Sequence, residues 1–224
     1  MPVYTLDERI IFPHPNFADE SGLLAVGGDL SQERLMLAYS QGIFPWYAED
    51  EPIMWWSPNP RMILFPDELK VSKSLKQSIN NKEFEIKFDT LFEKVISNCS
   101  KSPRSDQDGT WITEQMKQAY TNLHQLGYAH SVETYFNGEL VGGLYGISLG
   151  KAFFGESMFF TKRDASKIAL YFLVQKLKEW DFHFIDAQVE TEHLKSMGAQ
   201  LISRKEFLIS LNTALNFPTI QGKW

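Results

Sequence analysis

The sequence has few of the features found in disulfide-rich, membrane-spanning or metal-binding proteins. Its 224 residues include one cysteine, Cys99, so no intrachain disulfide can form, which fits a reducing compartment. No apolar run approaches the roughly 18 residues that a membrane span needs, and the acidic start around Asp7 and Glu8 is unlike a secretory signal. The five histidines show no metal-ligand spacing. These absences predict a soluble cytoplasmic protein without a metal site.

Positive charge is also scarce overall, and it is unevenly distributed. The formal net charge of −6 argues against a general nucleic-acid binder. Residues 1–60 hold nine acidic and two basic residues, whereas residues 70–104 hold eight basic and four acidic ones. This asymmetry permits a local phosphate-binding face on an acidic protein. The alternative is an ordinary solvated surface of mixed charge.

The order of apolar periods and turn signals predicts an α+β fold. Residues 1–30 are expected to be irregular, and Ser31 is expected to cap the first helix, which ends near Gly42. Asn137-Gly138 predicts a tight hairpin, so three successive strands form an antiparallel meander. A polar loop is expected over 101–110. The expected strands are 62–65, 84–88, 129–136, 139–148, 151–160, 182–187 and 198–203, and the expected later helices are 72–80, 91–100, 113–126, 164–180, 190–196 and 204–215.

Two of these strands carry polar side chains. The apolar run Phe153–Phe160 has Glu156 in its middle, and a carboxylate is rarely buried unless it is paired or used. In the second run, Asp186 and Gln188 lie two residues apart, so both are expected on one face of the strand. If the two strands are neighbours, Glu156, Asp186 and Gln188 converge at a pocket. Structural roles for the two carboxylates remain the alternative.

Aromatic residues are concentrated ahead of the alternating region. Trp46, Trp55 and Trp56 lie within eleven residues that prolines frame and stiffen. We expect Trp55 and Trp56 to pack the junction between a small N-terminal domain, residues 1–62, and a larger domain, residues 63–224.

A central antiparallel sheet followed by a long helix and another strand resembles the Gcn5-related acetyltransferase superfamily. That superfamily carries a glycine-containing loop for the coenzyme A pyrophosphate where the strand meets the long helix. Here the junction, Thr161–Lys167, contains no glycine and includes Asp164. The resemblance therefore implies the fold, an acetyltransferase-like domain with a mostly antiparallel sheet flanked by helices, without acetyl-CoA.

Eight ordered segments carry a more specific resemblance: Gly22–Leu30, Gly42–Trp46, Trp55–Pro58, Gly109–Thr113, His130–Glu133, Leu140–Gly146, Gly155–Phe159 and Ile185–Gln188. Through these segments, over most of its length, the chain resembles the leucyl/phenylalanyl-tRNA–protein transferase family. The family often has Cys where Ala187 stands, and some members have a longer tail.

This resemblance implies a reaction and its partners. Leucine or phenylalanine, and also methionine, passes from aminoacyl-tRNA to the α-amine of an N-terminal Arg or Lys on an acceptor protein. The modified protein is thereby marked for degradation by the N-degron pathway. No metal or dissociable cofactor is implied, and we expect a monomer.

For this reaction we expect the following roles of individual residues. The carbonyl oxygen of Gln188 accepts a hydrogen bond from the attacking amine and is oriented by Asp186, while Asp186 or Glu156 pairs with the cationic side chain of the acceptor. Trp46 and Trp111 provide a platform for the terminal adenosine of tRNA. An apolar slot for the aminoacyl side chain is expected from Phe153, Met158, Leu170, Leu173 and Ile185. Acceptor-stem phosphates are expected to contact Arg61, Lys70, Lys73, Lys76, Lys101 and Arg104, because Lys70, Lys73 and Lys76 recur at helical spacing.

Two rival functions fit parts of this pattern. A small-molecule acyltransferase that uses an acyl-CoA would need the missing glycine loop. A non-catalytic adaptor that binds basic N-termini would explain an acidic pocket, but neither the aromatic nor the basic residues.

Overall fold

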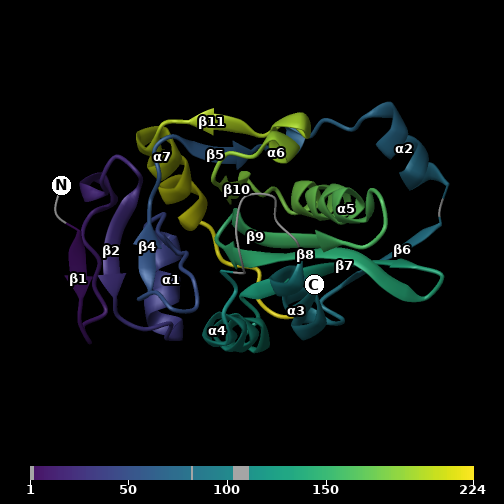
Figure 1. Ribbon diagram of the computed structural model, residues 1–224. Helices are drawn as coiled ribbons and strands as arrows, with labels where there is room; N and C mark the ends of the chain where they lie inside the picture. Colours follow the sequence, from purple (N-terminus) through teal and green to yellow (C-terminus); the bar gives the residue numbers. More distant parts are fainter. Residues whose placement is uncertain (1–2, 82, 103–110) are drawn as a thin grey trace.

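The computed structural model describes residues 3–81, 83–102 and 111–224, and its centre is a seven-stranded sheet (Figure 1). Strand β9 is parallel to β10, and every other neighbouring pair is antiparallel. The α+β fold with a mostly antiparallel sheet is confirmed, as is the β7–β8–β9 meander. In spatial order the strands are β11 (Gln200–Ile202), β5 (Arg61–Leu64), β10 (Phe184–Gln188), β9 (Ala152–Phe160), β8 (Glu139–Leu149), β7 (Ala129–Phe136) and β6 (Phe84–Phe88).

Helices cover both faces of this sheet. On one face, α5 (Ala165–Glu179) packs a buried apolar stripe on β7 and β8, and the short helix α2 (Lys73–Asn80) contacts α5. On the other face lie α3 (Phe92–Lys101), α4 (Glu114–Gln125) and α7 (Arg204–Leu215). The last helix, α6 (Glu192–Ser196), follows β10. The predicted helices are confirmed to within one or two residues at their ends.

The N-terminal region is not irregular, so that prediction was wrong. Its strands form a second, four-stranded sheet beside α1 (Gln32–Ser40), which Ser31 caps as expected. The strands are short and separated by turns at positive-φ glycines such as Gly22, so turn signals hid them in the sequence. In spatial order they are β1 (Tyr4–Leu6), β2 (Leu23–Gly27), β4 (Met54–Trp56) and β3 (Phe44–Pro45), and 3-10 turns lie at η1 (Pro15–Phe17) and η2 (Pro66–Glu68).

The two sheets share one hydrophobic core. Leu24 and Leu35 from the N-terminal unit and Ile63 and Val95 from the larger unit belong to the same buried cluster. The small sheet ends at Trp56 and the large sheet begins at Arg61. A division at residue 62 stays a prediction, because the packing is continuous across it.

The tryptophans of β4 make hydrogen bonds within the N-terminal unit. The Trp55 indole is fully buried and donates to the carbonyl oxygen of Gly27, at 2.9 Å. The Trp56 indole donates to the carbonyl oxygen of Trp46, at 2.7 Å. Their packing at the domain junction therefore stays a prediction. Within the described ranges, no helix is long and apolar enough to cross a membrane. Of the predicted polar loop, residues 103–110 lie outside the described residues.

Candidate active site

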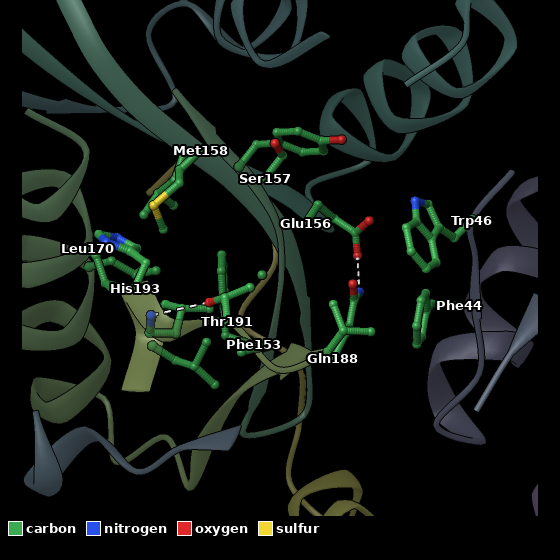
Figure 2. A pocket seen from close by; sticks show the side chains of 18 of the residues that line it. Phe44, Trp46, Phe153, Glu156, Ser157, Met158, Leu170, Gln188, Thr191 and His193 are labelled. Atoms are coloured by element: carbon green, nitrogen blue, oxygen red, sulfur yellow. Dashed lines mark hydrogen bonds between the residues drawn. The ribbon is translucent and has the colours of Figure 1, made fainter. Parts of the chain in front are cut away.

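A cavity of about 350 Å³ opens where the parallel strands β9 and β10 separate (Figure 2). Their pairing runs from Phe184 opposite Ala152 to Asp186 opposite Phe154 and then stops. Beyond that point β9 continues with Glu156 and β10 with Gln188, and both side chains line the cavity. The two strands are therefore neighbours, which is the condition under which the sequence analysis brings Glu156 and Gln188 together.

Two backbone irregularities aim these polar side chains into the cavity. In β9, Ser157 pairs with Tyr145 and Gly155 pairs with Gly146, so Glu156 lies in a bulge. In β10 the register shifts between Asp186 and Gln188, and Gln188 adopts a left-handed backbone with φ of 64°. Bulges re-aim side chains next to active sites, and a left-handed conformation costs energy in a residue other than glycine. Both features are typical of a functional site.

The Glu156 carboxylate is buried and accepts three side-chain hydrogen bonds. Its Oε1 accepts from Gln188 Nε2 at 2.8 Å and from the Tyr39 hydroxyl at 2.7 Å, and its Oε2 accepts from the Tyr120 hydroxyl at 3.1 Å. Burial raises the pKa of Glu156 to about 7, with a smaller contribution from the charge of Asp186, while the three donors act in the opposite direction. Both the protonated and the ionised form of Glu156 are therefore present near neutral pH.

The two tyrosines were not predicted from the sequence. Both are fully buried, and their hydroxyl oxygens lie 2.5 Å apart. Burial raises the pKa of Tyr39 and of Tyr120 well above its ordinary value, so both hydroxyls stay protonated, and each lies within hydrogen-bonding distance of Glu156 and of the other hydroxyl. Tyr39 is on α1 and Tyr120 on α4, so the N-terminal unit and the larger unit each place one tyrosine hydroxyl beside Glu156.

Asp186 does not face the cavity, contrary to the expectation from its two-residue spacing to Gln188. It is fully buried and forms a two-pronged ion pair with Arg61: Nε lies 2.8 Å from Oδ1 and Nη2 lies 2.6 Å from Oδ2. Ile185 and Ala187 line the cavity, so Asp186 between them points to the opposite face of β10. Gln188 then returns its side chain to the cavity because its backbone is left-handed.

Two predicted roles are therefore wrong. Asp186 cannot pair with the cationic side chain of an acceptor, because Arg61 already occupies its carboxylate. Arg61 cannot contact tRNA phosphates, because it is 1% exposed and its guanidinium lies over the rings of Phe44 and Phe207, at 4.7 and 4.5 Å. A buried cation of this kind neutralises a buried carboxylate.

The orientation of Gln188 comes from both carboxylates. Its backbone N–H donates to Asp186 Oδ1 at 2.9 Å, and its side-chain amide donates to Glu156. Asp186 thus holds the backbone, while Glu156 sets the direction of the amide. Since the amide nitrogen faces Glu156, the amide carbonyl oxygen is left for the cavity.

The predicted slot and platform residues all line this cavity: Trp46, Trp111, Phe153, Met158, Leu170, Leu173 and Ile185. Trp46 lies on the side of Glu156 and Gln188, whereas Met158 and Leu170 lie at the far side (Figure 2). The sequence reasoning missed Phe44, Leu144, Thr191 and His193, which also line it. No motif marks these four as a group, because they come from three separate segments: β3, β8 and the start of α6.

The predicted phosphate-binding residues do not form one patch. Lys73 and Lys76 are exposed on α2, but Lys70 precedes the helix, whose N-cap is Ser72. Lys101 ends α3, which packs on the opposite face of the sheet from α2. Arg104 lies outside the described residues.

Replacing Glu156 with glutamine is expected to stabilise the protein at pH 8. The folded-state pKa of Glu156 is raised, so the wild type loses stability as pH rises from about 4.5 to about 7, because the unfolded chain ionises first. Glutamine does not titrate, so the variant should exceed the wild type by up to about 3 kcal/mol at pH 8 and by little at pH 4.5. Urea unfolding at both pH values measures the difference. A pH-independent difference would contradict the raised pKa.

Comparison with known proteins assigns the family. The model of the leucyl/phenylalanyl-tRNA protein transferase family matches residues 63–212, and the model of that family's N-terminal domain matches residues 28–59. The chain belongs to the leucyl/phenylalanyl-tRNA–protein transferase family. A transferase of this name from Desulfatibacillum aliphaticivorans is 54% identical over 224 residues, covering 100% of this chain and 96% of the relative. One from Legionella pneumophila (strain Corby) is 55% identical over 219 residues, covering 97% of each.

Solved structures outside the transferase family are more distant. A GCN5-related N-acetyltransferase from Kribbella flavida is 8% identical, covers 74% of this chain and 58% of its own, and has a TM-score of 0.39. L-PGS from Bacillus licheniformis is 13% identical, covers 90% and 65%, and has a TM-score of 0.40.

Proposed function

We propose that this protein transfers leucine or phenylalanine, and also methionine, from aminoacyl-tRNA to the α-amine of proteins that begin with Arg or Lys, and so marks them for degradation by the N-degron pathway. Membership of the transferase family supports this reaction. The observation that carries it is the 2.8 Å bond between Gln188 and Glu156 at the wall of an apolar cavity. No metal or dissociable cofactor takes part, and the protein acts in the cytoplasm as a monomer.

The main contribution that this reaction needs from the protein is to position the amine against the ester. An α-amine has a pKa near ~8, so roughly a tenth of it is neutral at pH 7. Its nitrogen attacks the ester carbon, the bond from that carbon to the ribose oxygen breaks, and the amine loses one proton while the ribose oxygen gains one. The Gln188 carbonyl oxygen accepts a hydrogen bond from the attacking N–H and fixes its approach. Orientation of this kind can lower a barrier by about 7–11 kcal/mol.

The apolar part of the cavity selects the aminoacyl side chain. Phe153, Met158 and Leu170 surround the slot from β9 and α5. One methylene is worth about 1–3 kcal/mol, so a slot shaped for side chains unbranched at Cβ admits Leu, Phe and Met and penalises Val and Ile. Trp46 and Trp111 stack on the terminal adenine, a contact worth about 1–3 kcal/mol per base.

The cationic side chain of the acceptor pairs with Glu156. Of the two carboxylates considered for this role, Asp186 is occupied by Arg61. Glu156 lies at the cavity wall, and with a pKa of about 7 it is partly ionised at neutral pH, so it can accept a cation there.

The direct test is transfer of leucine to a peptide. The purified protein, leucyl-tRNA and an Arg-ended peptide should give a peptide heavier by one leucyl residue, detected by mass spectrometry. The same peptide with an acetylated N-terminus and the same reaction with valyl-tRNA should give no such product. Peptide binding without transfer would support the adaptor instead, and saturable coenzyme A binding would support the acyl-CoA enzyme.

Lys73 and Lys76 are expected to contribute affinity for tRNA. They are exposed on one side of α2, at the end of the molecule remote from the N-terminal sheet (Figure 1). Replacing both with alanine should weaken aminoacyl-tRNA binding and reduce the slope of log K against log salt by about 1.5, since each phosphate contact contributes about 0.7–0.9. Binding measured by filter retention at several salt concentrations checks this. Lys205→Ala, an exposed lysine on α7, is the control, and an unchanged slope in the double variant would remove α2 from the interface.

A further inference from the structure

The chain after α7 runs along the protein as a strap, residues 216–224, and ends near α3 (Figure 1). Thr219 accepts a hydrogen bond from the backbone N–H of Gly150, at 2.8 Å. Gly222 lies against Gly127, where a side chain on Gly127 would collide with the strap. These contacts fix the strap along its length.

Trp224 is the most firmly held residue of this strap. Its backbone N–H donates to Asp89 Oδ2 at 2.9 Å, and its indole stacks on the ring of His130, with 3.8 Å between centroids and 12° between planes. His130 Nδ1 lies 2.8 Å from Asp89 Oδ2, so the same carboxylate fixes both stacked rings. The indole also makes edge-on contacts with the rings of Trp180 and Phe182, at centroid distances of 5.1 and 6.1 Å.

The indole also contacts a wall of the aminoacyl cavity. The Phe153 ring lines that cavity and lies 5.7 Å from Trp224, at 43°. The sheet also lies close to Phe153: a Cβ on Gly146 would come within 2.6 Å of the Phe153 Cε1 atom. Gly146 pairs with His130 across β7 and β8, so the glycine and the stacked histidine lie side by side in the sheet. Phe153 therefore has the sheet at Gly146 and the indole of Trp224 as fixed neighbours.

We propose that Trp224 is a specificity-determining positioning residue, which fixes the size of the aminoacyl slot by holding the Phe153 ring in place. Trp224 itself does not touch the aminoacyl group. This inference rests on the proposed function, because it names which wall of the slot sets the preference among aminoacyl side chains. Without the indole, the space behind Phe153 lets the ring withdraw, and the slot then admits a larger side chain at lower cost.

Binding of stable substrate analogues tests this without turnover. The probes are 3′-aminoacylamido adenosines that carry leucine or phenylalanine, in which an amide replaces the reactive ester. Trp224→Ala should shift the ratio of the two dissociation constants about fivefold toward phenylalanine, a fraction of what one methylene can give. Trp224→Phe keeps a ring on His130 and should shift the ratio in the same direction by about twofold. Titration calorimetry on the full chain gives the dissociation constants. If Trp224→Ala does not fold, the result for Trp224→Phe decides the test.

Phe217→Ala is the matched control. Phe217 belongs to the same strap and packs edge-on against His183, at 5.1 Å, rather than against Phe153. The ratio of the two dissociation constants in Phe217→Ala should equal that of the wild type. Equal ratios in all variants, or the same shift in Phe217→Ala, would overturn the role of Trp224 and leave the proposed function standing. If the wild type bound neither analogue, the proposed function itself would be overturned.

Discussion

Replacing Arg61 with alanine is expected to lower the free energy of unfolding by about 3–5 kcal/mol, because the change leaves Asp186 as a buried, unpaired carboxylate. The guanidinium is also held by the Gly42 carbonyl oxygen at 3.2 Å and by two aromatic faces, so the loss includes packing. Chemical denaturation at pH 7 measures it. The control is Arg9→Ala, which removes an exposed ion pair with Asp7 and should leave the free energy of unfolding close to that of the wild type.

A double variant separates the charge from the packing. Arg61→Met with Asp186→Leu removes both charges while keeping side chains of similar size, so it should recover much of the stability that Arg61→Ala loses. Its transfer rate should nevertheless be lower than that of the wild type, because the Gln188 backbone N–H loses its acceptor on Asp186. If the double variant were less stable than Arg61→Ala, the buried charge would not be the cause of the loss.

Replacing Gln188 with alanine is expected to slow single-turnover transfer by about 10²–10³-fold, the range observed when one positioned hydrogen-bonding group is lost from an active site. Affinity for leucyl-tRNA should change by less than about threefold, because the slot and the aromatic platform are intact. Alanine tolerates the left-handed backbone no worse than glutamine does, so the fold should be retained. Rapid quenching with saturating enzyme gives the rate of the chemical step.

The matched control is Gln200→Ala, the same substitution at an exposed residue of β11, where the amide bonds to Glu68. Its transfer rate should equal that of the wild type. A Gln188→Ala variant with the wild-type rate would remove the amide from the mechanism. A loss of rate matched by an equal loss of tRNA affinity would assign Gln188 to binding alone.

The elements after residue 61 are predictable because their signals are long and agree with one another. The long helix α5 repeats its apolar residues at helical spacing, and Asn137-Gly138 sets the hairpin between β7 and β8. The N-terminal strands are two to five residues long, too short for a two-residue period to be distinguished from loop. Their pairing depends on tertiary packing, including the fully buried Trp55.

The active-site residues also fall into those that the sequence predicts and those that it does not. The polar residues within apolar runs marked Glu156 and Gln188 as candidates, and they meet because β9 and β10 are neighbours, which the sequence analysis had only as a condition. The outward turn of Asp186 was not predictable, since nothing in the sequence marks Gln188 for a left-handed backbone. Tyr39 and Tyr120 were missed because tertiary packing brings them to Glu156 across 117 and 36 residues. Arg61 looked like a surface cation because its partner lies 125 residues away.

The central claim is that the Glu156 carboxylate orients Gln188 for the attacking amine. The most direct test is the ratio of single-turnover rates of the wild type and Glu156→Gln, measured from pH 5.5 to 8.5 with leucyl-tRNA and an Arg-ended peptide. Both proteins use the same amine, so its titration cancels in the ratio. With the pKa of Glu156 at about 7, the ratio should rise with pH and have its midpoint near that value. A ratio that stays flat across this range would contradict the claim.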